Sequence, residues 1–374
     1  MVDTGPADVL VVGAGLAGSA AACLLAREGR KVVLLDRQTG PHHKVCGEFL
    51  SVEAAQHLGD LGLDLRALGA TSIDRVRLVS GRNEAEARLP FGAFGLSRHA
   101  LDEALLALAV EAGAEVERGV RVLELDGAAA RTNRGSREGR HVLLASGKLP
   151  IRENGAAPAG RSDDGYVGFK MHYRLAAAAS RRLAGTILLV LFEGGYAGLQ
   201  MVEDGRANLC VVLRRRQFVE VGGDWPAVRD RLDETQALRD MLADAEPLFE
   251  RPVTIANLAY GLPTRDLGDP RVLRLGDQWA MTASLTGDGM AIALRSAFVA
   301  ARCLVAGEDA ATYHRRLAEQ ARSQILRAMV LQNMLDRPVL RRIGCRLAGA
   351  FPSLLTHAAR STRLPEWDAG SGPA

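Results

Sequence analysis

Cysteine is scarce, and the few cysteines present form no recognisable motif. The 374 residues include five of them, and no two stand in a Cys-x-x-Cys pair: Cys23, Cys46, Cys210, Cys303 and Cys345. This spacing fits neither a zinc site nor a disulfide framework. We therefore expect reduced thiols, no bound metal and a cytoplasmic location.

A surplus of charge of one sign is also missing. The formal net charge is +3, and the basic residues are spread along the chain. A phosphate-binding surface usually shows as a basic patch or a basic domain. We therefore expect no nucleic-acid partner.

Long hydrophobic runs are absent too. No stretch reaches the roughly 18 consecutive apolar residues of a membrane-spanning helix. The first apolar run begins at Val9, follows no basic leader and is broken by Gly13. We expect neither export nor a membrane span. The composition, 48% hydrophobic and 24% charged, is that of an ordinary globular protein, and a length of 374 residues predicts two interlocked domains.

The predicted secondary structure changes character along the chain. Residues 8–35 alternate strand, helix and strand, whereas residues 166–213 form one strand after another. Beyond Gly289 almost every segment is helical to about Ala359. We predict an α/β fold in which a nucleotide-binding domain is interrupted by an antiparallel substrate domain and followed by C-terminal helices.

The predicted domains are discontinuous. The nucleotide-binding domain takes residues 1–80, 95–165 and 265–310, the substrate domain takes 81–94 and 166–264, and the C-terminal helices and tail take 311–374. Two segments have no apolar period: residues 127–139 are predicted to form the tip of a surface hairpin, and residues 155–165 a second loop of the same kind. The tail from Ser361 is rich in proline and glycine and is expected to be loose.

A glycine-rich turn carries the first chemical signal. The run Gly-Ala-Gly-Leu-Ala-Gly at 13–18 follows a strand and opens a helix, and Asp36 ends the next strand. Such glycines form a tight turn, let backbone approach a pyrophosphate and allow close helix–strand packing, while the carboxylate accepts hydrogen bonds from a ribose. The expected dinucleotide contacts are Gly13, Ala14, Gly15, Ala17, Gly18, Asp36 and Arg37.

Later motifs choose between nucleotides. Leu275-Gly276-Asp277 ends a strand, Thr286-Gly287-Asp288-Gly289-Met290 opens a long helix, and Arg98 begins a helix in the pattern Ser-Arg-x-x-Leu-Asp. With these motifs the sequence resembles the FAD-dependent oxidoreductases that include the group A flavoprotein monooxygenases, or aromatic hydroxylases, and the geranylgeranyl reductases. The resemblance implies a Rossmann-like, glutathione-reductase-type domain that binds FAD without a covalent link and is reduced by NADPH or NADH.

The resemblance also assigns roles to residues. In that superfamily a late Gly-Asp contacts the ribityl chain and pyrophosphate, and the following helix start lies against the flavin pyrimidine. The matching residues are Gly276, Asp277, Gly287, Gly289 and Met290. A helix N-terminus there stabilises the negative charge that hydride transfer leaves. Arg98 matches a cofactor-binding arginine, although a surface charge at a helix start remains the alternative.

The segment at 45–51 occupies the place where the family's chain wraps around the flavin ring, and its Cys-Gly pair resembles the reductase branch. Gly47 lets backbone pass close to the ring. Cys46 is either a catalytic group that touches flavin or substrate, or a small apolar filler. Glu48 is either a substrate ligand or a helix-start carboxylate.

The sequence departs from the family in several places. Ser146-Gly147-Lys148 stands where the hydroxylases carry an Asp-Gly pair, and Ala283 stands where a proline is usual. No Trp-x-Trp-x-Ile-Pro segment occurs, which disfavours a halogenase.

Strand alternation offers two further catalytic candidates. In the run 168–174, Lys170 and His172 share one face, and Phe169, Met171 and Tyr173 share the other. We consider Lys170 and His172 as groups that face the flavin, and His172 as a proton-exchanging group or a structural histidine.

The C-terminal helices carry six arginines among apolar residues, Arg337, Arg341, Arg342, Arg346, Arg360 and Arg363. The pattern fits contact with a membrane surface or a lipophilic substrate. It also fits a packed amphipathic helix whose arginines extend to solvent.

Three functions follow from these observations. The first is an FAD-dependent monooxygenase that hydroxylates a small aromatic or polyketide-like compound of secondary metabolism. The second is a geranylgeranyl-reductase-like enzyme that reduces a carbon–carbon double bond of a lipophilic substrate. The third is a flavin-binding protein without turnover. A sealed apolar tunnel beside the flavin would favour the reductase, and a compact pocket with one or two polar groups would favour hydroxylation. The residues indicate no oligomeric state.

Overall fold

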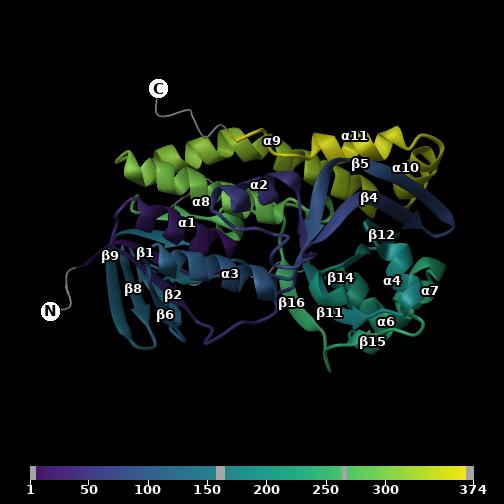
Figure 1. Cartoon of the computed structure of the whole chain (residues 1–374), viewed down its shortest axis with the longest axis horizontal. Coiled ribbons are helices and arrows are strands. Elements are labelled where there is room, and N and C mark those ends of the chain that lie inside the picture. The colour runs from purple at the N-terminus through teal and green to yellow at the C-terminus, as the bar shows by residue number, and fades with distance from the viewer. Residues whose placement is uncertain (1–5, 157–164, 263–267, 368–374) are drawn as a thin grey trace.

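The computed structural model describes residues 6–156, 165–262 and 268–367. Most of the predicted loop at 155–165, the first residues of the segment at 265–310 and the end of the tail lie outside these ranges. Two bodies lie side by side, and a layer of C-terminal helices runs along one side of both (Figure 1).

The first body is built on an eight-stranded sheet, in the order β10-β7-β8-β9-β1-β2-β6, with β17 also paired to β9. Its strands are β1 (Ala7–Val12), β2 (Val32–Asp36), β6 (Glu115–Arg118), β7 (Val122–Asp126), β8 (Ala129–Thr132), β9 (Gly135–Leu144), β10 (Arg152–Glu153) and β17 (Val272–Arg274). The pairs that join β6, β2, β1, β9 and β17 are all parallel. The segment 127–139, predicted as a hairpin tip, contains β8 and the start of β9, which pair antiparallel as a hairpin.

Both faces of the parallel strands are covered. Val9 and Val11 of β1 pack with α1 (Leu16–Arg27), α3 (Arg98–Glu111) and α8 (Gly289–Val305), whereas Leu10 and Val12 pack toward β7 and β8. A strand buried on both faces is expected to be a continuous apolar run, as Val9–Val12 is. The helix α2 (Val52–Asp60) packs beside α8.

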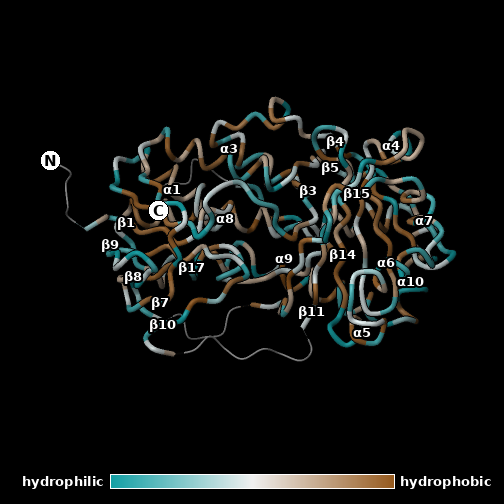
Figure 2. The backbone as a smooth tube through the Cα atoms, turned by 90° about the horizontal axis from the view of Figure 1, so that it is seen from below, coloured by the Kyte–Doolittle hydropathy of each residue, from teal (hydrophilic) through white to brown (hydrophobic). Residues whose placement is uncertain are grey.

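The second body is a nine-stranded sheet in the order β15-β11-β14-β13-β12-β4-β5-β3, with β16 paired to β11. Its strands are β3 (Phe49–Leu50), β4 (Thr71–Ser80), β5 (Asn83–Gly95), β11 (Tyr166–Arg174), β12 (Thr186–Phe192), β13 (Gly195–Met201), β14 (Ala207–Arg214), β15 (Glu246–Pro247) and β16 (Val253–Leu258). Figure 2 shows the apolar stretches of these strands running through the interior.

Two expectations about this sheet are corrected. Residues 71–80 were expected in the nucleotide-binding domain, but they form β4, which lies between β12 and β5 of the second sheet. The physical reason is the tight turn at Gly81, with φ +60°, which makes β4 and β5 one hairpin and keeps both strands in one sheet. The β4–β12 pair is parallel, so the sheet is mixed instead of purely antiparallel.

Helices cover one face of the second sheet. They are α4 (Ala177–Leu183), α5 (Arg215–Glu220), α6 (Trp225–Asp233) and α7 (Gln236–Leu242). Phe169, Met171 and Tyr173 of β11 are buried in the core beneath them. The chain breaks between α6 and α7 because Thr235 is extended, with φ −89° and ψ 114°.

The opposite face of this sheet meets the C-terminal helices α9 (Ala310–Asp336), α10 (Pro338–Ala350) and α11 (Ser353–Ser361). The long helix α9 reaches from the first body toward the second, and α10 and α11 lie over β5 (Figure 1). Pro338 separates α9 from α10, since a proline suits the first position of a helix and ends the preceding one. No helix within the described ranges is long and apolar enough to cross a membrane.

Candidate active site

A cavity of about 1150 Å³ lies where the two bodies and the C-terminal helices meet. Its walls come from the glycine-rich turn, the end of β2, the segment 42–49, the inner face of the second sheet, the start of α8, and α9 to α11. Segments far apart in the sequence thus share one compartment.

The glycine-rich turn has the geometry that a dinucleotide requires. Gly13 has φ +108°, and a Cβ there would lie 2.5 Å from the carbonyl oxygen of Ala145. A Cβ at Gly18 would lie 1.9 Å from the carbonyl oxygen of Gly13, so only glycine lets α1 start so close to β1. Asp36 lines the cavity at the end of β2, where its carboxylate accepts a hydrogen bond from the backbone NH of Gln38.

Two cations stand beside this turn. A Cβ built on Gly15 would lie 3.5 Å from Lys44 Nζ and 3.6 Å from Arg98 Nη2. Both cations bind Asp102, Lys44 at 2.6 Å and Arg98 at 2.6 and 2.9 Å. Burial raises the pKa of Asp102, but the two cations outweigh burial and leave that pKa below its usual value. The cluster keeps one net positive charge next to the N-terminus of α1, which fits a pyrophosphate.

The late motifs meet at the same cavity. Gly276 has φ +55° and Gly287 has φ +73°, and a Cβ on Gly287 would lie 2.7 Å from the ring of Phe49. Asp277 forms an ion pair with Lys148 at 3.0 Å. Burial lowers the pKa of Lys148, but Asp277 outweighs burial and the pKa is raised. The lysine that replaces the family's Asp-Gly pattern is therefore the ionic partner of the late aspartate.

The turn at residues 46–48 is held in a strained conformation. Glu48 has φ 58°, a left-handed value that a residue with a side chain rarely adopts. Gln200 donates to the carbonyl of Glu48 at 2.7 Å, and Asn208 donates to the carbonyls of Cys46 at 3.1 Å and Gly47 at 2.9 Å. A Cβ on Gly47 would meet no atom within 4 Å, so open space lies in front of this glycine.

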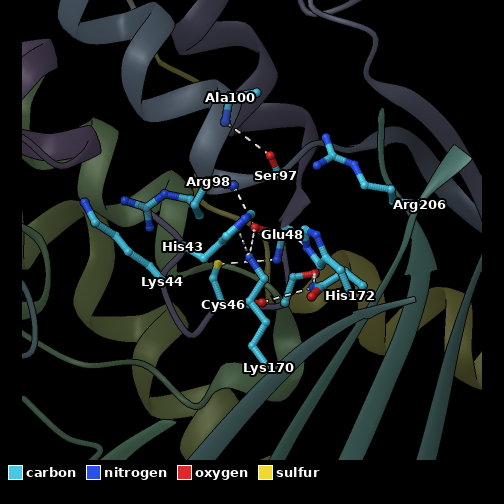
Figure 3. Close-up of polar contacts among 12 residues, drawn as sticks. His43, Lys44, Cys46, Glu48, Ser97, Arg98, Ala100, Lys170, His172 and Arg206 are labelled. Carbon is cyan, nitrogen blue, oxygen red and sulfur yellow. Dashed lines mark hydrogen bonds and ion pairs between the residues drawn. The ribbon is translucent and has the colours of Figure 1, made fainter. Parts of the chain in front are cut away.

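A cluster of buried charge stands behind the turn (Figure 3). The carboxylate of Glu48 accepts from Lys170, from His172 at 2.8 Å and from the backbone NH of Arg98 at 2.7 Å. Burial raises the pKa of Glu48, but the hydrogen bond from His172 and the charge of Lys170 outweigh it, so the pKa is lowered. Burial, reinforced by Lys170, lowers the pKa of the neighbouring His43 to about 3, which makes it a neutral imidazole.

The cluster does not need a metal ion. His43, Glu48 and His172 present ligand atoms within 4.8 Å of one another. However, Lys170 already bonds to Glu48 and lies 3.5 Å from Nδ1 of His43. The ammonium group thus supplies the positive charge that a cation would bring to this place.

Most of the sequence-predicted residues line the cavity. They are Gly13, Ala14, Gly15, Ala17, Asp36, Arg37, Cys46, Gly47, Arg98, Gly276, Asp277, Gly287, Gly289 and Met290. Gly18 packs behind the turn. Lys170 and His172 are fully buried and are not among the lining residues, so they border the cavity through Glu48 and His43, which do line it.

Several residues of the site were missed by sequence reasoning. The sequence left Glu48 as a substrate ligand or a helix-start carboxylate and did not predict its contacts with Lys170 and His172. It gave Lys148 no ionic partner and assigned no role to Lys44, Gln200 or Asn208. The basic run that ends at Lys44, just before the Cys-Gly pair, was the one available signal. The two amides lie on β13 and β14, and sequence alternation does not indicate which loop a strand side chain contacts.

Comparisons with known proteins agree with this geometry. Residues 6–145 match the protein family described as FAD binding domain. The digeranylgeranylglycerophospholipid reductase 2 of Methanopyrus kandleri is 28% identical over 318 residues, which cover 81% of this chain and 76% of that protein. The menaquinone reductase of Mycobacterium tuberculosis is 33% identical over 166 residues, which cover 41% of this chain and only 39% of that protein.

The likeness in fold extends over nearly the whole chain. The structure of the flavin-dependent brominase Bmp2 superposes with a TM-score of 0.79 and 18% identity, covering 96% of this chain and 93% of that one. The expected α/β fold with an FAD-binding domain is confirmed. The glycines, the cation pair and the late motifs also fit FAD on physical grounds. The resemblance indicated by the sequence motifs is thereby confirmed, and the chain is an FAD-dependent oxidoreductase.

Proposed function

We propose that this oxidoreductase reduces a carbon–carbon double bond in an elongated lipophilic molecule, with NADPH or NADH as the source of electrons. The observation that carries the proposal is the shape and lining of the cavity. Beyond the expected flavin position, the cavity continues between the second sheet and the C-terminal helices. That arrangement supports a long substrate more than a compact aromatic one.

The extension is apolar on both sides. The sheet contributes Val76, Leu78, Leu89, Phe91, Ile187 and Leu189, and the helices contribute Leu331, Met334, Leu335, Leu340, Leu347, Leu354 and Leu355. From Leu331 to Ala359 every lining residue is apolar or small, and charge returns only with Arg363. An alkyl or prenyl chain would bury its surface there without leaving a polar group unpaired.

The names of two relatives support the same substrate class. The protein from Methanopyrus is named as a reductase of a digeranylgeranylglycerophospholipid, and the mycobacterial protein as a reductase of menaquinone. Both compounds are lipophilic.

The chain's own groups suit such a reaction. Bound FAD would supply the hydride that one carbon of the double bond accepts. The other carbon needs a proton, and Cys46 carries a thiol on the cavity wall beside the open space at Gly47. Glu48, fixed by Lys170 and His172, holds this thiol in place, since its backbone NH donates to Sγ of Cys46 at 3.3 Å. We assign Cys46 the proton donor's role, and Glu48, Lys170 and His172 positioning roles.

Hydroxylation with oxygen is the second candidate. The apolar walls that suit a lipid also exclude water, and the exclusion of water is what an oxygen-activating flavin site requires. The two reactions differ in what they consume, so one experiment separates them.

The experiment follows reoxidation of the flavin. The purified protein is reduced anaerobically with NADPH or NADH and then mixed in a stopped-flow instrument with polyprenyl alcohols, menaquinone or phenols, with and without oxygen. Reoxidation by a polyprenyl compound without oxygen, with two hydrogens added to the product by mass spectrometry, supports the proposal. Reoxidation that needs oxygen and adds an oxygen atom establishes hydroxylation instead, and no substrate-dependent reoxidation indicates a protein without turnover.

A further inference from the structure

The C-terminal helices carry apolar side chains on the outside of the molecule. Val339 is 66% exposed, Ile343 is 49% exposed and Phe351 is 59% exposed, and none of the three lines the cavity. Val339 and Ile343 are four residues apart, so they lie on one face of α10. We call Val339, Ile343, Leu347, Phe351 and Leu354 the apolar stripe.

The apolar stripe is not the face by which α10 packs on the rest of the protein. The opposite face of α10 is packed, since Arg341, Cys345 and Ala348 are buried. A helix on the surface of a globular protein normally directs polar side chains outward. Here the outer face is apolar as well, and adjacent exposed apolar residues mark an interaction surface.

Positive charge surrounds the stripe. Residues 337–363 include six arginines and no aspartate or glutamate. Arg337 caps the start of α10, Arg342 and Arg346 lie on α10, and Arg360 lies on α11; all four are exposed. Within the part of the chain that the structure describes, none of these four forms an ion pair with a carboxylate. An exposed apolar surface bordered by unpaired arginines is complementary to anionic lipid headgroups above acyl chains.

The stripe is continuous with the cavity. Leu347 and Leu354 belong to the stripe and also line the cavity, together with Leu340 and Leu355 of the same two helices. Apolar surface therefore leads from the outside of α10 and α11 into the compartment between these helices and the second sheet.

We propose that α10 and α11 dock the protein on an anionic phospholipid bilayer, with the apolar stripe in the lipid interface and Arg337, Arg342, Arg346 and Arg360 at the phosphates. In this position the cavity opens toward the lipid phase. Membrane docking is a property beyond the proposed reaction. It rests on the proposed reaction only in that a lipophilic substrate would enter the cavity through this opening.

Vesicle flotation of the full FAD-loaded chain tests the docking. Vesicles of phosphatidylcholine with phosphatidylglycerol are expected to bind the protein, and vesicles of phosphatidylcholine alone to bind it much less. Replacing Arg342 and Arg346 by glutamine should lower the partition coefficient about fivefold for each arginine. Val339→Ser with Ile343→Ser should lower it about tenfold or more.

Matched variants control for general effects. Val219→Ser removes an exposed apolar side chain of α5, and Arg181→Gln removes an exposed charge of α4. Both should leave vesicle binding unchanged, and every variant should keep its FAD content and melting temperature. Equal binding by the wild type to neutral and anionic vesicles, or equal losses in the control variants, would overturn the proposal.

A second measurement locates the stripe. The tryptophan fluorescence that Ile343→Trp adds should be quenched by phospholipids with brominated acyl chains. The fluorescence that Val219→Trp adds should not be quenched. Absence of quenching at position 343 overturns the proposal. If light scattering shows an oligomer that Ile343→Ser converts to a monomer, the stripe is an interface between copies and the proposal is wrong. These measurements need no substrate. A negative result would overturn the docking proposal without bearing on the proposed reduction. A negative result for the reduction would leave the docking proposal standing.

Discussion

At the scale of single residues, Glu48 unites four parts of the site. It belongs to the turn beside the cavity, and its groups bond to β11 through Lys170 and His172, to the start of α3 through the NH of Arg98, and to β13 through Gln200. These contacts hold a backbone conformation that the residue would otherwise avoid.

Glu48→Gln should lower the free energy of unfolding by about 3 kcal/mol or more, because Lys170 would keep a buried charge without its partner. Urea unfolding of the FAD-loaded protein measures the change. Glu246→Gln serves as the control, since Glu246 pairs with Arg174 at the surface and should contribute almost nothing. Equal stability of Glu48→Gln and the wild type would contradict this role.

The difference in stability between the wild type and Glu48→Gln should also depend on pH. The pKa of Glu48 is lowered in the folded state, so its stabilisation is complete above the unfolded value of about 4.3 and is lost as the pH falls through the folded value. The difference in unfolding free energy between wild type and Glu48→Gln should therefore be largest above about pH 5 and shrink below about pH 4. A difference independent of pH would show that Glu48 is not the titrating group.

Asp277→Ala should release FAD, because this carboxylate lies at the cavity next to Gly276. The ratio of flavin to protein absorbance in the purified protein measures the loss. Lys148→Met is the matched variant, since it removes the same ion pair but keeps the aspartate. If both variants lose flavin equally, the ion pair and not the carboxylate is required.

Cys46→Ser should keep its FAD and slow the flavin's reoxidation by substrate tenfold or more, because a serine hydroxyl is a weaker proton donor than a thiol. Reduction by NADPH or NADH should proceed at the wild-type rate. Unaltered reoxidation would return Cys46 to a structural role.

At the scale of elements, the start of α8 is tied to the C-terminal segment. Arg363 pairs with the buried Asp288, donates to the carbonyl of Thr286 at 2.7 Å and stacks on Phe91 at 5.0 Å. Burial raises the pKa of Asp288 to about 7 even though Arg363 opposes the shift. The loop expected to border the flavin and the wall of the lipophilic compartment thus share one ionic contact.

Asp288→Asn tests that contact through pH. A carboxyl whose folded pKa lies above its unfolded value stabilises at low pH, and this contribution is lost as the pH rises toward the folded value. As the pH rises from about 4 to 7, the free energy of unfolding of Asp288→Asn should therefore increase relative to that of the wild type by about 1.4 kcal/mol for each pH unit. Urea unfolding at pH 5 and 7 measures it, and a constant difference would contradict the raised pKa.

Prediction from sequence worked where local chemistry decides the outcome. The βαβ unit with Gly13 and Gly18, the helix that starts at Arg98 and the turn at Gly287 all depend on neighbours a few residues away. It failed where the partner is distant. Alternation along residues 71–80 predicts a strand but not the sheet that strand joins, and the Lys148–Asp277 pair spans 129 residues. The reach of the cavity under α10 and α11 depends on packing that no motif records.

At the scale of the whole molecule, the compartment between the second sheet and the C-terminal helices should determine which substrate lengths the enzyme accepts. Gly344 lies in α10 and lines the cavity, and a Cβ there would meet no atom within 4 Å. Gly344→Leu should therefore place an apolar side chain in the compartment with no clash at its Cβ, and helix propensity should raise stability by up to about 1 kcal/mol. The KM for long prenyl alcohols should rise several-fold while that for the shortest stays the same. Gly344→Ala is the control, and equal effects at all chain lengths would contradict a substrate in this compartment.

The pairing of β17 with β9 also sets an order of events during synthesis. Val272 to Arg274 close the parallel sheet on strands made more than a hundred residues earlier, and Gly276 and Asp277 follow directly. A nascent chain that ends before β17 has an open, apolar sheet edge and half of its cofactor site. The stretch 6–145 that matches the FAD-binding family is thus a unit of sequence without being a unit of folding. The cofactor site is therefore complete only after β17 and the turn at Gly276 have been synthesised and have joined the sheet at β9.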